Sequence, residues 1–194
     1  GMPWADPRAM SHSWLFTGPP GSGRSLAAID FAAALMCTDP EEPGCGRCEA
    51  CQAVLDAKQH TDLVLVDPQE VIIPVDTVRE VIGRAASLPT VAPWRVVIFN
   101  NADRLNNNGA NALLKTVEEP PARTVIIMCA PSDAPEDFSQ TLRSRCRHLY
   151  IPSPSVESIT AQLVSEGASD HDAHLAALTS LRHVGRARRL VNDP

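Results

Sequence analysis

This 194-residue chain has no long apolar run and no excess of basic charge. No stretch of 18 apolar residues occurs, so we expect no membrane span, and no secretory signal is visible. Lysine and arginine total 17 against 23 aspartate and glutamate residues, which gives a net charge of −6. This balance argues against strong nucleic-acid binding by the chain outside an assembly. We therefore expect a cytoplasmic protein that does not bind membranes.

Aromatic residues are also scarce, at 4%, but the apolar fraction of 44% suffices for a hydrophobic core. Short apolar runs alternate with segments of helical character, and most of these runs are continuously apolar. That alternation predicts an α/β fold whose parallel sheet is covered by helices on both faces. The expected strands are 14–17, 63–66, 94–99, 124–129 and 148–151. The expected helices between them are 25–36, 76–87 with Asp76 as its cap, 109–118 and 138–143.

The character of the sequence changes after Pro152-Ser-Pro154. Three helical segments follow, at about 156–166, 172–180 and 185–191, with no strand between them. We therefore predict two domains, a core over 1–152 and a small all-helical lid over 153–194.

A glycine-rich turn, "GPPGSGRS", joins the first expected strand to the first expected helix. It matches the phosphate-loop pattern G-x-x-x-x-G-K-[ST] except at Arg24, where the pattern has lysine. In such a loop the backbone N–H groups and the helix dipole bind phosphate, and a serine holds Mg²⁺. The candidate nucleotide-contacting residues are Gly18, Gly21, Gly23, Arg24 and Ser25. The alternative is a strand-turn-helix corner without a ligand.

Hydrolysis of ATP at a phosphate loop needs carboxylates at the end of a neighbouring strand, one for Mg²⁺ and often one for water activation. The strand expected to carry them is followed instead by Asn100 and Asn101. An amide carries no charge for a metal ion and takes no proton from water. We therefore expect no ATP hydrolysis at this site.

Four cysteines lie within fifteen residues, at Cys37, Cys45, Cys48 and Cys51. Two spacings of C-x₂-C and a set of four sulfur ligands are typical of a closed, structural Zn²⁺ site. The alternative is a loop with free cysteines. Cys129 falls in an expected core strand and is interpreted as a small apolar residue.

Four motifs together resemble one known family. They are GPPGSGRS, the four-cysteine loop over 37–51, NALLKTVEEPPA at 111–122 and TLRSRCR at 141–147. In this order they resemble the AAA+ core and lid of the clamp-loader subunits of bacterial DNA polymerase III, which include delta-prime and gamma/tau branches. The resemblance implies a P-loop NTPase fold of three αβα layers with a five-stranded parallel sheet and a helical lid. We expect the family's third, collar-forming helical domain to be absent from these 194 residues.

The resemblance also implies roles for single residues. Arg145, in the Ser-Arg-Cys segment, would be an arginine finger that reaches ATP bound to a neighbouring motor subunit. Ser132 would occupy the sensor-1 position and Arg188 the sensor-2 position. The implied partners are the gamma/tau and delta subunits, and through the assembly the sliding clamp and primed DNA. A plain stripe of surface arginines is the alternative for Arg143, Arg145 and Arg147.

The chain differs from the motor subunits of this family at three positions, and these differences bear on whether it hydrolyses ATP. Those subunits have a lysine in the loop and an Asp-Glu pair after the third strand, where this chain has Arg24, Asn100 and Asn101. This favours a non-hydrolysing delta-prime subunit in which binding of ATP and Mg²⁺ is weak or absent. The alternatives are an active gamma/tau-type ATPase and a small-molecule kinase. The cysteine loop and the Ser-Arg-Cys segment count against the kinase.

Overall fold

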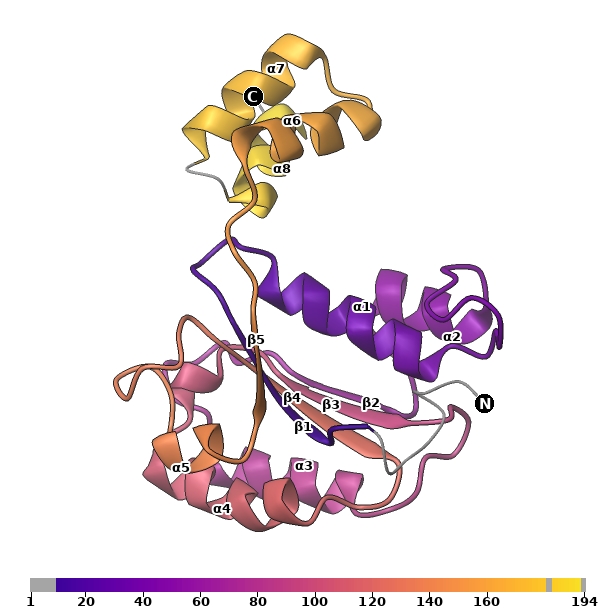
Figure 1. The fold of residues 1–194 in the computed structure, drawn as a ribbon, viewed down its shortest axis with the longest axis vertical. Coiled ribbons are helices and arrows are strands. Elements are labelled where there is room, and N and C mark those ends of the chain that lie inside the picture. The colour runs from indigo at the N-terminus through magenta and orange to yellow at the C-terminus, as the bar shows by residue number, and fades with distance from the viewer. Residues whose placement is uncertain (1–9, 181–182, 193–194) are drawn as a thin grey trace. The chain divides into compact units, whose positions relative to one another are not determined.

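The computed structural model describes residues 10–180 and 183–192 (Figure 1). The chain divides into two compact units. One contains the first strand and Ser25–Leu149, and the other contains Gly18–Arg24 and Tyr150–Pro194. The predicted domain boundary after residue 152 stays a prediction.

The first unit is built on one five-stranded parallel sheet with the order β2-β3-β4-β1-β5. The central strands β3 and β4 are buried at every position, because helices cover both faces of the sheet. Their parallel register pairs Phe99 with Met128, and β1 pairs with β4 on the other side. The predicted α/β fold is confirmed. The strands are β1 (Ser13–Thr17), β2 (Leu63–Val66), β3 (Arg95–Phe99), β4 (Thr124–Ala130) and β5 (Arg147–Tyr150).

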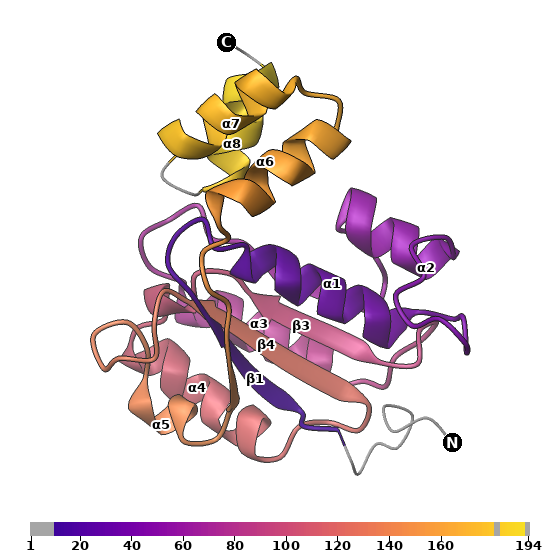
Figure 2. The same cartoon turned by 45° about the horizontal axis from the view of Figure 1, so that its top comes forward.

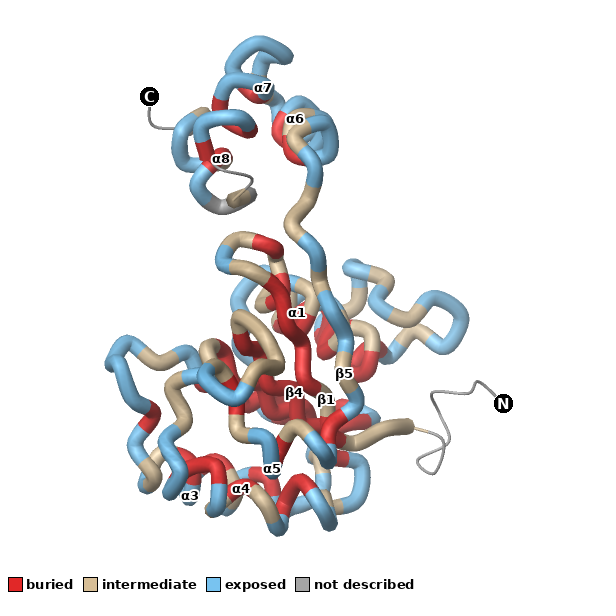
Figure 3. Tube along the Cα trace, turned by 60° about the vertical axis from the view of Figure 1, so that its left-hand side comes forward, coloured by how far each residue is buried: buried red, intermediate tan, exposed pale blue. Residues whose placement is uncertain are grey.

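Helices lie on both sides of the sheet (Figures 1 and 2). One face carries α1 (Arg24–Met36) and α2 (Glu49–Gln52), and the other carries α3 (Val75–Ala85), α4 (Asn107–Glu118) and α5 (Gln140–Arg143). Each face has its own hydrophobic cluster, one centred on Phe16, Met36 and Ile98 and the other on Leu15, Phe99 and Leu113. Burial is therefore concentrated in the central strands and the inner sides of these helices (Figure 3).

Two local expectations, the cap of α3 and the start of β5, need correction. Asp76 does not cap α3, because the helix begins one residue earlier, after Pro74, and Asp76 lies in its first turn. Proline without an N–H and with a fixed φ suits this boundary. The four-cysteine loop over 37–51 contains the start of α2, which continues into a π-helical turn at Ala53–Ala57. Strand β5 begins one residue earlier than expected and is largely exposed, because it lies at the edge of the sheet.

The C-terminal helices are α6 (Val156–Ser165), α7 (Asp170–Thr179) and α8 (Val184–Asn192). They enclose a small apolar core that includes Ile159, Leu163 and Ala177. Serine caps set two of the helix starts, since Ser155 Oγ accepts from the Ser158 amide and Ser169 Oγ from the Asp172 amide. Within the described residues, no helix combines the length and apolar character needed to cross a membrane.

Candidate functional site

The four-cysteine loop begins where α1 ends and closes on α2. Cys37 follows the last residue of α1, and Cys48 is the N-cap of α2. The Cys48 Sγ accepts a hydrogen bond from the Cys51 amide at 3.4 Å, so the same sulfur starts the helix. The amides of Arg47 and Cys48 point at Cys45 Sγ, each at 3.4 Å. Backbone N–H groups directed at sulfur stabilise thiolates, the form in which cysteine binds a metal.

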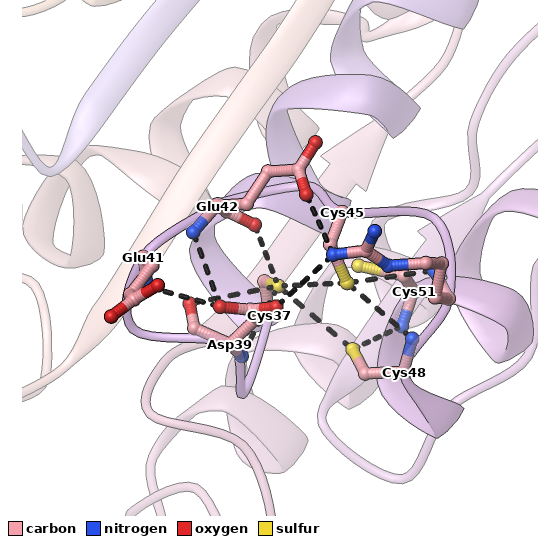
Figure 4. Close-up of polar contacts among 8 residues, drawn as sticks. Cys37, Asp39, Glu41, Glu42, Cys45, Cys48 and Cys51 are labelled. Atoms are coloured by element: carbon pink, nitrogen blue, oxygen red, sulfur yellow. Dashed lines mark hydrogen bonds and ion pairs between the residues drawn. The ribbon is translucent and has the colours of Figure 1, made fainter.

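The sulfur positions in this cluster fit a tetrahedral metal centre (Figure 4). The four Sγ atoms lie within 4.8 Å of one another. Cys37 Sγ is 3.7 Å from Cys45 Sγ and 3.9 Å from Cys48 Sγ. Zn–S bonds of about 2.3 Å in a tetrahedron place the sulfurs about 3.8 Å apart. The six cysteines, all within the described residues, form no disulfide bond. The cluster is therefore consistent with one closed Zn²⁺ site and leaves no position open for a substrate.

The cysteine thiols of this cluster differ in how readily they ionise. Burial opposes ionisation of Cys48, but hydrogen bonds from the Thr38 and Cys51 backbone amides outweigh it and lower its pKa to about 6. Burial, together with the neighbouring Cys48 and Cys37, raises the pKa of Cys51 to about 12. Negative charge on one sulfur thus suppresses charge on the next. A divalent cation would remove this conflict, because it favours the thiolate form of all four ligands.

The phosphate loop is held by its own arginine. Gly21 and Gly23 have φ values of +85° and +90°, which side-chain-bearing residues rarely adopt. Arg24 is 9% exposed, and its Nη1 donates to the Gly18 carbonyl oxygen at 2.5 Å. The guanidinium group therefore binds a backbone oxygen of the loop itself. A lysine would place a compact ammonium group there in place of a planar, forked one, so its contact with this oxygen would have a different geometry. Ser25 lies in the first turn of α1 and is partly exposed.

The end of β3 carries amides in a tight turn, as the sequence indicates. The backbone N–H of Asn100 donates to the Val66 carbonyl of the neighbouring strand at 2.8 Å. The side-chain Oδ1 of Asn100 has no hydrogen-bond donor among the described residues. Asn101 adopts a left-handed conformation, with φ of 52°, and leads into a short 3₁₀ turn at Ala102–Arg104. Asparagine tolerates this conformation better than most residues. This corner therefore presents no carboxylate at either position.

Each of the two predicted sensor residues has a carboxylate partner, five positions away in sequence for Ser132 and 22 positions away for Arg188. Ser132 Oγ donates to Asp137 Oδ2 at 2.7 Å and accepts from the Ala134 amide, which closes a turn after β4. Arg188 on α8 donates through Nε and Nη2 to both carboxylate oxygens of Glu166, at 2.8 and 2.5 Å. The hydrogen bonds from Arg188 lower the pKa of Glu166. The assignment of both residues to sensor positions stays a prediction.

The three arginines of the Ser-Arg-Cys segment do not share one environment. Arg143 Nε donates to Asp133 at 3.0 Å, and its Nη2 donates to His148 Nδ1 at 3.2 Å. Arg145 pairs with Glu118, and Arg147 lies over the ring of Trp14 at 5.2 Å from its centre. Of the three, Arg145 is the one whose side chain is held by a carboxylate of a helix, Glu118 at the end of α4.

Sequence reasoning missed two polar networks. One joins Asp133 through Arg143 to His148, whose Nε2 lies 2.6 Å from Thr17 Oγ1 at the end of β1. Because arginine only donates, Nδ1 of neutral His148 accepts and Nε2 donates to the threonine. The other is the buried pair of Asp62 and Arg95. In the second network Asp62 directly precedes β2 and Arg95 is the first residue of β3, and this position beside a strand was the available signal.

The fold and the phosphate-loop corner together indicate the structural class of the chain. A parallel αβα core with a phosphate-loop corner and a helical C-terminal unit is an AAA+-like arrangement. A DNA polymerase III gamma subunit-related protein of Thermotoga maritima superposes with a TM-score of 0.65 at 20% identity, over 94% of this chain and 54% of that one. The RuvB Holliday junction branch migration motor of the same organism gives 0.59 at 17% identity, over 95% and 55%. At these identities the likeness shows the fold alone.

Sequence comparison is more specific. The family model described as DNA polymerase III, delta subunit, matches residues 5–155. The DNA polymerase III subunit delta-prime of Pseudomonas aeruginosa is 36% identical over 86% of this chain, and that of Escherichia coli is 35% identical over 86%. The subunit gamma/tau of Mycobacterium tuberculosis is 33% identical over 87% of the chain and 30% of its own length. The chain belongs to the delta-prime family of DNA polymerase III clamp-loader subunits, which is related to gamma/tau.

The matched region is only part of the relatives. The chain spans about half the length of the delta-prime proteins it matches, 52% for Pseudomonas aeruginosa and 50% for Escherichia coli. The similarity thus concerns about half of each of these subunits.

Proposed function

We propose that this chain works as a non-hydrolysing clamp-loader subunit of the DNA polymerase III holoenzyme. It would act beside gamma/tau and delta subunits, helping to place a sliding clamp on primed DNA. Family membership supports this assignment. The non-hydrolysing part rests on the chemistry of three residues, Arg24 in the phosphate loop and Asn100 and Asn101 after β3. Arg24 is engaged by the loop itself, and the β3 end offers amides where a metal and a base are needed.

The part of the proposal that concerns catalysis rests on Arg145. Its side chain is 35% exposed at the turn after α5, and its planar guanidinium group carries five N–H donors suited to phosphate oxygens. We assign it to stabilise the charge that develops on the γ-phosphate of ATP held by a neighbouring subunit. Arginine fingers supplied in trans raise hydrolysis rates by roughly 10³–10⁵. The chain would thus promote its neighbour's reaction without performing one of its own.

The cysteine cluster has a structural role in this proposal. Cys37, Cys45, Cys48 and Cys51 would hold Zn²⁺ in a closed tetrahedral site that fixes the loop between α1 and α2. Four sulfurs leave no coordination position for water, so the ion would supply folding free energy and no chemistry on a substrate. ATP and Mg²⁺ would bind this chain weakly or not at all.

Substitution of Arg145 in a reconstituted clamp loader tests the proposal. In Arg145→Ala the loader should still assemble, but clamp- and DNA-stimulated ATP hydrolysis should fall by at least about 10²-fold at the adjacent site. Arg147→Ala is the matched control, because Arg147 lies in the same segment but packs over Trp14. Equal hydrolysis in Arg145→Ala and Arg147→Ala loaders would refute the trans role.

The alternative of an active gamma/tau-type ATPase makes a different prediction. Robust steady-state ATP turnover by the isolated chain would favour that alternative and refute the non-hydrolysing assignment. We expect no turnover above a sample without protein.

A further inference from the structure

A single carboxylate holds the exposed Arg145 side chain. Glu118 is the last residue of α4, and its Oε1 accepts a hydrogen bond from Arg145 Nε at 2.5 Å. The two residues are 27 positions apart in sequence and belong to different elements, so this contact depends on the folded core.

Stability alone does not account for a carboxylate at this place. The C-terminal end of a helix carries partial negative charge, so a glutamate in the last turn of α4 is disfavoured there. The side chains of Arg145 and Glu118 are 35% and 46% exposed, and exposed ion pairs contribute little to stability. What the pair does fix is the direction of the arginine.

The remaining contacts of Arg145 complete that orientation. Its Nη1 donates to the Thr141 carbonyl at 2.7 Å and to Ser144 Oγ at 3.1 Å. Its Nη2 makes no hydrogen bond within the part of the chain that the structure describes. A guanidinium group is planar and rigid, so fixing Nε and Nη1 also fixes where Nη2 points. Two of the three guanidinium nitrogens are thus held by the chain, and Nη2 is left for a ligand.

We propose that Glu118 is a positioning residue for Arg145. Together with the Thr141 carbonyl and Ser144, it orders the guanidinium group before the neighbouring subunit's nucleotide reaches it. A long arginine side chain would otherwise lose rotamer freedom on contact, which weakens the interaction in the transition state. The inference rests on the proposed trans role of Arg145.

The test uses the reconstituted loader with clamp and primed DNA. We expect Glu118→Ala to lower the stimulated kcat about threefold, with the KM for ATP unchanged, because the bound ATP itself is held by another subunit. Glu118→Gln keeps an oxygen acceptor at the same place and should retain most of the rate. Glu119→Ala is the matched control, since Glu119 is the next residue, is exposed and makes no side-chain ion pair among the described residues.

A double substitution separates positioning from a general structural effect. If Glu118 acts through Arg145, Glu118→Ala should have no further effect in an Arg145→Ala loader. Additive losses, an unchanged rate in Glu118→Ala, or a faster rate as expected of an inhibitory contact would each overturn the inference. If Arg145→Ala itself leaves the rate intact, the proposed function fails. If only Glu118→Ala does so, the proposed function stands and the positioning role is rejected.

Discussion

Asp62 and Arg95 form an ion pair at 2.9 Å in which the two side chains are 0% and 7% exposed. Asp62 also accepts hydrogen bonds from the backbone amides of Thr90, Val91 and Ala92, at 2.7 to 2.9 Å. The pair thus ties the loop before β3 to the start of β2. A buried pair is weak evidence of net stability, but removal of one partner leaves an uncompensated buried charge.

Asp62→Asn should therefore destabilise the chain strongly. The amide loses the charge that Arg95 needs and offers one oxygen where two are used, so we expect a loss of about 3–5 kcal/mol in the free energy of unfolding. Urea denaturation followed by circular dichroism measures it. Asp67→Asn, at an exposed position just after β2, is the control and should change stability by less than about 0.5 kcal/mol. Similar midpoints for the two variants would contradict the role assigned to Asp62.

The same carboxylate should make stability depend on pH. Burial opposes ionisation of Asp62, but the three backbone amides and Arg95 outweigh it and hold its pKa well below the ordinary value near 4. Below about pH 4 the unfolded chain binds a proton that the folded chain does not, so stability is present above that pH and is lost on acidification. Unfolding curves between pH 7 and pH 3 should show this loss, and Asp62→Asn should show less of it. If stability falls equally with pH in the unsubstituted chain and in Asp62→Asn, Asp62 does not contribute to the pH dependence.

Metal analysis tests the cysteine cluster. We expect one zinc per purified chain, and a chelator should lower the unfolding temperature, because structural zinc sites contribute up to roughly 10 kcal/mol. Cys45→Ser should lose the metal, and acid should release it from the unsubstituted chain because protons compete for thiolates. Cys129→Ala, which alters a buried cysteine of β4 outside the cluster, should keep the full zinc content. A zinc content near zero in the unsubstituted chain would reject the site.

Equilibrium binding of labelled ATP addresses the phosphate loop. We expect a Kd weaker than about 0.1 mM, with no gain from Mg²⁺, since the β3 end lacks a carboxylate. The combined substitution Arg24→Lys and Asn100→Asp should tighten binding in the presence of Mg²⁺, because it restores the point charge and the metal ligand together. Tight, Mg²⁺-dependent binding by the unsubstituted chain would contradict the expectation.

Apolar runs and spacing were enough to predict most of the fold. Strands such as β3 and β4 are visible because a strand buried on both faces must be continuously apolar. The C-x₂-C spacing likewise predicted a cluster of four sulfurs, because ligands of a closed site must converge within a few residues. Such features are encoded locally, so one sequence reveals them.

Features that depend on strand order were not predictable. Leu63 lies beside Val96 in the sheet, so the preceding residues Asp62 and Arg95 also face one another, but only once β2 is known to neighbour β3. The same holds for Glu118 and Arg145, which meet because α4 and the turn after α5 lie close on one face. A charged residue beside an apolar strand, such as Asp62, indicates that an ion pair is needed, but the sequence does not show which residue completes the pair.

The hydrogen bond from the Cys51 amide to the Cys48 sulfur has a consequence for how this chain acquires its structure. A single atom both begins a helix and forms one corner of the proposed metal centre. Zinc binding and the start of α2 would then occur together, so the rate at which the four-cysteine loop folds would depend on the supply of zinc. Replacing that sulfur by oxygen, in Cys48→Ser, would separate the two, because serine is a good helix cap and a poor zinc ligand.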